Sequence, residues 1–310
     1  MGGTNTSEEF TKLLEAKMRK VVEEEAQYAD VESMIPKIFG SGQSDRAFEE
    51  YFSVSGVRDA YAWGGKFVTQ KQYPGYTNKV VFQRFANRLE IDPALIEDKQ
   101  YPVMMDQARD LRNSYDRKAE KTAVNVFANA NSAAFDFQES EEGLSWANSS
   151  HTTKVPEVST ASGYSNTGTS ALDPTSLAAA RISMMRFRDG MGNLMNSRGR
   201  LAVVIPVTLE DTLTEIIGTG TGLYTDEGTI NVHQGRYSSI PWVLLDDTST
   251  TDWTLINVDR TKRDLLWFDR LAAKYMVHID MDTLASVHSI HGRFGYLFKD
   301  WRFGYHNNVA

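Results

Sequence analysis

The longest regular pattern of apolar and polar positions runs from Pro102 to about Asn131. Apolar or small residues recur there every three or four positions, which places them on one stripe of an α-helix. The stripe consists of Met104, Ala108, Leu111, Tyr115, Ala119, Thr122, Val126 and Ala130. At about 1.5 Å per residue this helix is about 40 Å long, so we expect other elements to pack along it. Just upstream, Asp92 and Pro93 predict a short helix that ends near Asp98.

An amphipathic helix is also predicted at the N-terminus. Thr6 and Glu9 form a capping box, and the helix that it opens extends to about Glu25. Its apolar stripe consists of Phe10, Leu14, Met18 and Val21 or Val22. This stripe either packs on the core of its own chain or belongs to an arm that lies along a neighbouring molecule.

The segment after this helix has a broken pattern. Short helical pieces are predicted at 31–38 and 45–51. The Gly-Ser-Gly sequence at 40–42 lies between them and favours a hinge, because glycine permits many backbone conformations.

The pattern over residues 56–91 predicts a long β-hairpin. Apolar residues alternate on both expected strands: Tyr61, Trp63, Phe67 and Thr69 on the first, and Val81, Phe85, Leu89 and Ile91 on the second. The sequence at 73–76, Tyr-Pro-Gly-Tyr, fits a type II turn. No third strand adjoins this ribbon in sequence, and a two-stranded ribbon is only marginally stable in water. We therefore expect it to lie on a surface of its own chain or of another.

The second half of the chain predicts a module of mixed order. A low-complexity stretch at 131–173 leads to a helix that Asp173 caps, with Leu177, Ala180, Met184 and Phe187 on one face. A second capping box, Thr208 with Asp211, opens a helix that ends at Ile217. Strands are predicted at 201–206, 229–233, 240–245, 254–258, 265–269, 275–279 and 287–305, with a break in phase at Lys299-Asp300. Because helices and strands do not alternate strictly, the fold class is α+β. We expect the last strand to return to the long helix.

Composition narrows the functional classes. A chain of 310 residues can bury a sizeable core, and the absence of cysteine excludes disulfides and thiolate metal sites. No apolar run approaches the roughly 20 residues that span a membrane, and no signal sequence opens the chain, so we expect no membrane partner. The net charge of −8 argues against a nucleic-acid reader, although a container for DNA would benefit from not adhering to its contents.

Few residues form a pattern typical of catalysis or metal binding. The GTGTG sequence at Gly218–Gly222 resembles a phosphate-binding loop, but it follows a predicted helix instead of joining a strand to a helix. We predict no cofactor and interpret this stretch as a flexible tip. The six histidines, His151, His233, His278, His288, His291 and His306, lack metal-binding spacing, so structural roles are expected for them. A soluble enzyme that uses His278, Asp280, Asp282 or His288 stays open as an alternative.

Four stretches of sequence are distinctive when they are taken together and in order. They are RLEIDPALIEDKQY (88–101) with the long helix that ends EKTAVNVFANA (120–130), GLSWANSSH (143–151), SLAAARISMMRFRDGMGN (176–193) with LAVVIP, and GRFGYLFKDWRFGYHN (292–307). Together they resemble the tailed-phage major capsid proteins of the type called the Mu-like major head subunit. Order and spacing agree from about Tyr51 to Asn307, although Pro102 stands where that family usually has glycine.

This resemblance implies an α+β protein with the Hong Kong-type capsid fold. Residues 1–52 would form an N-terminal arm, and residues 53–91 an extended E-loop β-hairpin. Residues 92–172 would form a peripheral (P) domain with the long spine helix and a β-sheet, completed by 266–310. Residues 173–265 would form a mixed α/β axial (A) domain.

The function implied by the resemblance is structural. The chain would self-assemble into pentamers and hexamers of an icosahedral phage head that encloses double-stranded DNA without sequence-specific binding. Its partners would be other copies of itself, with scaffold, portal and decoration proteins as further candidates, and the virion shell would assemble in the host bacterial cytoplasm. An encapsulin-like cargo compartment with the same fold is the alternative, which the contents of the particles would distinguish.

Three places supply the expected contacts between subunits. They are Phe10 and Leu14 in the arm, Tyr61, Trp63, Phe67, Tyr73 and Tyr76 on the hairpin, and Gly218, Gly220 and Gly222 at a tip that would face a symmetry axis. The first 50 residues are acidic and hold no large extra domain. We therefore expect a separate scaffold protein and little removal of the N-terminus.

Overall fold

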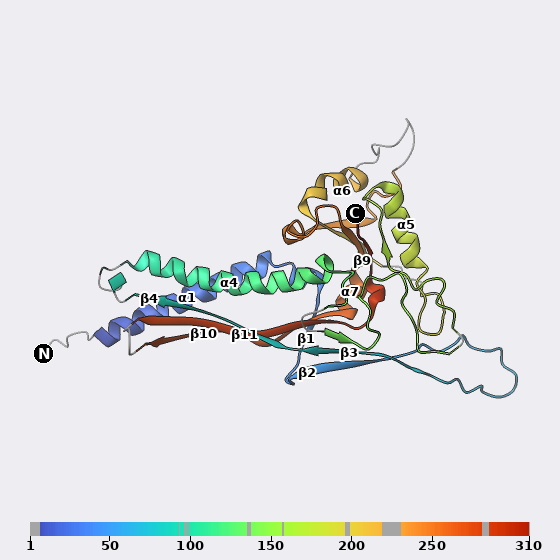
Figure 1. Cartoon of the computed structure of the whole chain (residues 1–310), viewed down its shortest axis with the longest axis horizontal. Helices are drawn as coiled ribbons and strands as arrows, with labels where there is room; N and C mark the ends of the chain where they lie inside the picture. The colour runs from blue at the N-terminus through green and yellow to red at the C-terminus, as the bar shows by residue number, and fades with distance from the viewer. Residues whose placement is uncertain are drawn as a thin grey trace.

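The computed structural model describes residues 7–92, 94, 95, 98, 100–134, 138–156, 158–195, 199–218, 231–280 and 285–309. Within them the molecule is elongated (Figure 1). Two long helices and a sheet of long strands form one end, a second module with shorter elements stands beside them, and a loop extends at the other end. No described helix is long and apolar enough to cross a membrane.

The long helix predicted from the apolar stripe is α4 (Tyr101–Ala128). Every member of that stripe is buried except Ala119, which is half-buried and packs against the core. Helix α1 (Ser7–Glu32) lies alongside α4, and its Met18 and Val22 pack with Met104 and Ala108. The N-terminal helix is therefore longer than predicted, and the described part of its stripe packs on its own chain.

Four strands form the sheet that supports α4. Their order is β1 (Gly40–Gly42), β10 (Leu265–Ile279), β11 (Ser286–Phe298) and β4 (Gln83–Ile91). Strand β11 returns to the long helix as predicted, since the rings of Phe294 and Tyr115 meet edge-on with centroids 5.8 Å apart. At Gly292 an added Cβ would lie 2.0 Å from Tyr115 Oη, so glycine allows the helix to approach the sheet closely.

A three-stranded sheet of β2 (Phe48–Val54), β3 (Pro74–Val81) and β5 (Gln138–Ser140) lies at the base of the extended loop. The predicted hairpin is therefore wrong in its strands. Its first strand is β2 and not 61–69. Residues 74–76 begin β3 instead of forming the tip, and β4 joins the long sheet. Residues 55–73 form the extended loop. The prediction failed here because alternation of apolar residues does not show which segment finds a pairing partner.

Two predictions before β2 are also wrong. Residues 45–51 are not helical, and most of them belong to β2 or the bend before it. The predicted hinge at 40–42 is strand β1, which pairs in parallel with β10. Its glycines serve close packing, since a Cβ at Gly40 would lie 1.9 Å from the Lys262 carbonyl oxygen. Helix α2 (Ile35–Ile38) confirms a short helical piece within 31–38.

The second module is built on a five-stranded sheet. Its order is β6 (Thr167–Gly168), β12 (Gly304–Asn307), β9 (Trp253–Asn257), β7 (Leu201–Ile205) and β8 (Tyr237–Pro241). Helices α5 (Pro174–Met185) and α6 (Glu210–Ile217) pack against it. Helix α7 (Val258–Asp264) leads directly into β10, so the two modules share a continuous chain path.

Capping was predicted correctly at one helix of this module and wrongly at another. The Asp173 carboxylate accepts a hydrogen bond from the Ser176 N–H at 2.8 Å, as expected for α5. Helix α6 has no side-chain cap and follows a 3₁₀ turn, η1 (Val207–Leu209). The Thr208 hydroxyl donates instead to Asp246, a residue distant in sequence that local pattern reasoning does not include.

Several predicted strand limits also change. The stretch 240–245 is the end of β8 followed by the 3₁₀ turn η2 (Val243–Leu245), and the described part of 229–233 is a turn. The strands predicted at 265–269 and 275–279 are one strand, β10. The break in phase at 299–300 is real: β11 ends there, and η3 (Trp301–Phe303) leads into β12 in the other sheet.

The short helix predicted before α4 lies mostly outside the described residues. Its predicted cap is present, since the Asp92 carboxylate accepts a hydrogen bond from the Ala94 N–H at 2.8 Å.

Candidate assembly surfaces

Loop 55–73 carries three of the predicted contact residues. Tyr61, Trp63 and Phe67 keep 58%, 69% and 91% of their accessible surface. Trp63 and Phe67 meet edge-on with ring centroids 5.2 Å apart, and the loop extends beyond the body of the molecule (Figure 1). Burying one such side chain away from water stabilises the buried state by about 1.5–3 kcal/mol. The isolated chain leaves most of that stabilisation unused, so the loop is suited to a contact with another molecule.

Tyr73 and Tyr76 differ from these three because they are half-buried at the base of the loop. The Tyr76 hydroxyl lies 2.7 Å from Thr152 Oγ1. The Tyr73 N–H donates to Ser55 Oγ at 2.8 Å, which closes the loop where it leaves the sheet. These two tyrosines therefore anchor the loop to its own chain.

The other predicted contacts fall mostly outside the described part of the chain. Phe10 and Leu14 belong to α1, but their side chains are not among those that the structure describes. Gly218 is the C-cap of α6, while Gly220 and Gly222 lie outside the described residues. Contacts at the arm and at the glycine-rich tip stay predictions.

An apolar patch on the outer face of the three-stranded sheet was missed by sequence reasoning. Phe48 and Phe52 of β2 share this face with Val81 of β3, which is paired directly with Phe48. All three side chains are exposed. The alternation in FEEYFSV (48–54) is the signal that could have found it. The patch extends the apolar surface of the loop to its base.

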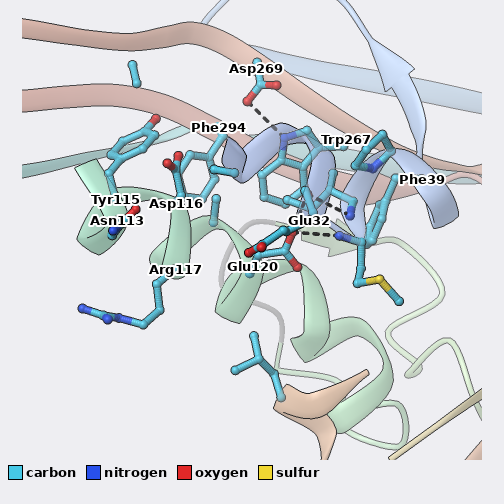
Figure 2. Close-up of a pocket in the computed structure, with 18 of the residues that line it drawn as sticks. Glu32, Phe39, Asn113, Tyr115, Asp116, Arg117, Glu120, Trp267, Asp269 and Phe294 are labelled. Carbon is cyan, nitrogen blue, oxygen red and sulfur yellow. Dashed lines mark hydrogen bonds between the residues drawn. The ribbon is translucent and has the colours of Figure 1, made fainter. Parts of the chain in front are cut away.

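A groove of about 1390 Å³ lies between the end of α1, helix α4 and strand β10 (Figure 2). Glu120 Oε1 accepts hydrogen bonds from the Ser33 hydroxyl and, at 3.0 Å, from the Met34 N–H. Across the groove the Trp267 indole N–H donates to Asp269 at 3.0 Å. The Glu120 carboxylate thus fixes the turn after α1 to α4, and the Asp269 carboxylate fixes the Trp267 ring within β10.

All four distinctive sequence stretches meet at one junction between the two modules. Phe127, from the stretch that ends the long helix, meets Trp146 edge-on with ring centroids 6.1 Å apart. Trp146, from the stretch 143–151, is fully buried and stacks on Phe303 with ring centroids 4.8 Å apart. Trp301 meets Phe187, from the stretch 176–193, at 5.2 Å. The distinctive stretches therefore contain the residues that hold the two modules together.

His151 and Glu142 form a buried hydrogen-bonded pair at this junction. His151 Nδ1 lies 3.2 Å from the Glu142 carboxylate, and Nε2 lies 3.1 Å from the Trp146 carbonyl oxygen and 3.2 Å from Asn166 Oδ1. Each ring nitrogen of His151 therefore faces a hydrogen-bond acceptor, which fixes the orientation of the ring. The His151 ring stacks on that of Trp301, with ring centroids 4.1 Å apart and an interplanar angle of 4°.

The pKa of Glu142 reflects these contacts. Burial alone would raise the pKa of this carboxyl, but hydrogen bonds from His151 and from Thr152 lower it below its usual value. The neighbouring Glu141 carboxylate accepts from the Thr77 N–H of β3 at 2.9 Å. The segment around 141–152 therefore connects the base of the loop to the junction.

Two of the remaining histidines, His288 and His306, are buried and have polar partners. Among the described residues no group of three His, Asp or Glu side chains is placed to hold a metal ion. His306 Nδ1 lies 2.8 Å from Thr254 Oγ1, and His288 lies between Tyr275 and Ser286. In the enzyme alternative, Asp282 lies outside the described part. His288 and His278 occupy opposite faces of the long sheet, because His288 pairs with position 277.

Comparison with known proteins gives a family and a fold. A family model described as phage capsid protein matches residues 76–307. A search of curated proteins finds no match to the chain. The fold is similar to that of a chain from Mycobacterium phage Patience, with a TM-score of 0.59, 7% identity, and coverage of 95% of this chain and 88% of that chain.

Two further solved structures are similar. The capsid of Ralstonia phage GP4 has a TM-score of 0.57 at 9% identity, with 90% of this chain and 91% of that chain covered. The capsid of a native GTA particle has a TM-score of 0.57 at 9% identity, with 89% of each chain covered. At such low identity the likeness concerns the fold alone.

Proposed function

The chain belongs to the phage capsid protein family and is a structural protein of a capsid shell, and from this premise we propose that it is the major subunit of a tailed-phage head. Copies of it would form pentamers and hexamers of an icosahedral shell around double-stranded DNA. Shells of this kind need repeated heterologous contacts that close by symmetry. The Mu-like subtype and the host cytoplasm as the site of assembly are part of the proposal.

The observation that supports this function best is loop 55–73. Its exposed Trp63 and Phe67 lack cover from the described part of their own chain, and Phe48 and Phe52 continue the apolar surface at its base. Exposed apolar surface of this kind typically marks a site of association. A shell subunit would bury this surface against a neighbour in every copy.

The division of the chain follows the same proposal. Residues 1–52 would serve as the arm, 53–91 as the E-loop and its return, 92–172 with 266–310 as the P-domain, and 173–265 as the A-domain. Strand pairing favours counting β2 with the E-loop and β4 with the P-domain. Portal and decoration proteins, and a separate scaffold protein, are further proposed partners.

Electron microscopy and sedimentation of the purified protein test this function. We expect rings, tubes or closed shells in the megadalton range, because the extended loop needs neighbours to cover its aromatic residues. A monodisperse monomer of about 35 kDa over a wide range of salt and protein concentration would contradict the proposal.

The comparisons favour a phage head over an encapsulin-like cargo compartment. The contents of particles from an infected or induced culture separate the two functions. Nuclease-protected double-stranded DNA is expected for a head, whereas a packaged enzyme would indicate a cargo compartment.

A further inference from the structure

The long sheet has one face covered by helices. The Asn87 side chain of β4 donates to Ser114 Oγ of α4 at 2.8 Å, and Gly292 of β11 lies under Tyr115. Positions 85, 87 and 89 of β4 therefore point toward α4. Figure 1 shows α1 and α4 on this side of β4, β10 and β11. Alternate positions point to the other side of the sheet.

On that other side the strand register gathers positive charge. The rows across β4, β11 and β10 are Arg84 with Arg293 and Leu271, Ala86 with His291 and Lys274, Arg88 with Ser289 and Met276, and Glu90 with Val287 and His278. Paired residues share a face, so Arg84, Arg88, Arg293 and Lys274 lie together with Glu90. We call this set the basic face; its formal charge is +3 in a chain whose net charge is −8.

The basic face includes a repulsive pair. Arg84 lies directly opposite Arg293, and like charges in directly opposed positions destabilise an antiparallel sheet. Within the described residues neither side chain has an ion-pair partner, while Arg88 pairs with Glu90. Arg293 donates to the Phe82 carbonyl oxygen at 3.2 Å, which satisfies hydrogen bonding but leaves its charge uncompensated. Placing Arg84 opposite Arg293 does not stabilise the isolated chain. A partner that brings negative charge would compensate both arginines and remove the repulsion.

We propose that the basic face is an interface that binds an acidic surface of a second copy of this chain. Subtracting its +3 from the chain's −8 leaves a net charge of −11 on the rest of the molecule, so the remaining surface of a neighbouring copy is acidic on balance. Exposed carboxylates such as Glu23, Glu24 and Glu32 of α1 are of the required kind. This inference rests on the proposed function, since shell assembly is what brings copies side by side.

A second copy suits the basic face better than nucleic acid does. Binding to a phosphate backbone gains affinity with each neutralised phosphate, and this face offers four cations within an otherwise acidic molecule. Charge complementarity between proteins, by contrast, requires only a few matched pairs to guide association and to set the register of contact.

The test replaces the repulsive pair. In Arg84→Gln/Arg293→Gln, we expect the unassembled subunit to melt at the wild-type temperature or above it, because a repulsion has been removed. The assembled fraction in low salt, measured by sedimentation velocity, should fall at least threefold. The control Arg117→Gln/Lys121→Gln removes the same charge from exposed positions of α4 and should assemble like the wild type.

Two results would overturn the inference. One is wild-type assembly by the Arg84→Gln/Arg293→Gln variant, and the other is a lowered melting temperature, which would make the pair structural. If wild-type assembly is accompanied by weaker binding to a 30-base-pair DNA duplex in fluorescence anisotropy, the face is assigned to nucleic acid. If the wild type itself forms no particles, the proposed function fails, and the inference falls with it.

Discussion

At the scale of single residues, the buried histidines couple folding to pH. Burial lowers the pKa of His306 and of His288 to about 4, so both rings are neutral in the folded subunit near neutral pH. In the unfolded chain their pKa values return to about 6.5. Between pH 6.5 and 4 the unfolded chain therefore binds protons that the folded chain does not bind. The stability that these groups contribute is complete above pH 6.5 and is lost as the pH falls toward 4.

The lowered pKa values of the two histidines predict how the stability of the unassembled subunit depends on pH. Each histidine should lower the free energy of unfolding by about 1.4 kcal/mol per pH unit between pH 6.5 and 4. His306→Gln removes one of the two groups, so urea unfolding at pH 7 and at pH 5 should show a smaller loss on acidification than in the wild type. The difference between the two losses should be about 1–2 kcal/mol.

His288→Gln provides a second variant, in case His306→Gln weakens the core too far for a clear transition. Equal losses between pH 7 and pH 5 in the wild type and in both variants would show that these histidines are not neutral in the folded state.

At the scale of elements, the distance between α4 and the long sheet depends on Gly292. A Cβ there would lie 2.0 Å from Tyr115 Oη and 2.9 Å from the Leu271 carbonyl oxygen. Overpacking a core in this way costs about 1–3 kcal/mol. We therefore expect Gly292→Ala to lower the midpoint of urea unfolding, with α4 forced away from β11.

The companion change Tyr115→Phe removes the nearest of the three colliding atoms, which are Tyr115 Oη at 2.0 Å, Tyr115 Cζ at 2.8 Å and the Leu271 carbonyl oxygen at 2.9 Å. Gly292→Ala/Tyr115→Phe should recover part of the lost stability but not all of it, because the contacts with the ring carbon Cζ and with the backbone of β10 persist. A double variant as unstable as the sum of the two single variants would show that the phenol oxygen does not cause the strain.

At the scale of the whole molecule, folding and assembly depend on different side chains. Leu111 lies in the buried stripe of α4, whereas Trp63 lies on the exposed loop. Leu111→Ala should leave a cavity that costs about 2–5 kcal/mol and lower the melting temperature of the free subunit. Trp63→Ala should change that melting temperature little, while it strongly reduces the particle yield.

Circular dichroism melting of free subunits, beside particle yield by sedimentation, separates these effects. The two substitutions are matched in kind, since each truncates one large apolar side chain to alanine. If Trp63→Ala lowers the melting temperature as far as Leu111→Ala does, loop 55–73 belongs to the core of its own chain and the proposed contact is wrong.

The sequence by itself determined the elements whose pattern is long or strongly signalled. The stripe of α4 continues over many turns, and the Asp173 cap and the buried strand β7 are marked by local chemistry. These features depend on residues that are close in sequence, so the local pattern of side chains is enough to predict them. The exposure of Tyr61, Trp63 and Phe67 was also expected, because the surrounding sequence supplies too little apolar cover.

Only the tertiary structure decided which segments pair. Aromatic alternation in loop 55–73 suggested a strand, but β3 pairs with β2 and β5, and β4 joins β11 across about 200 residues of chain. The glycines at 40–42 suggested a hinge, but they form strand β1 because β10 approaches them closely. The basic face likewise exists only through the register that sets Arg84 opposite Arg293. The physical reason is that backbone pairing and charge proximity depend on partners remote in sequence, which a local pattern does not specify.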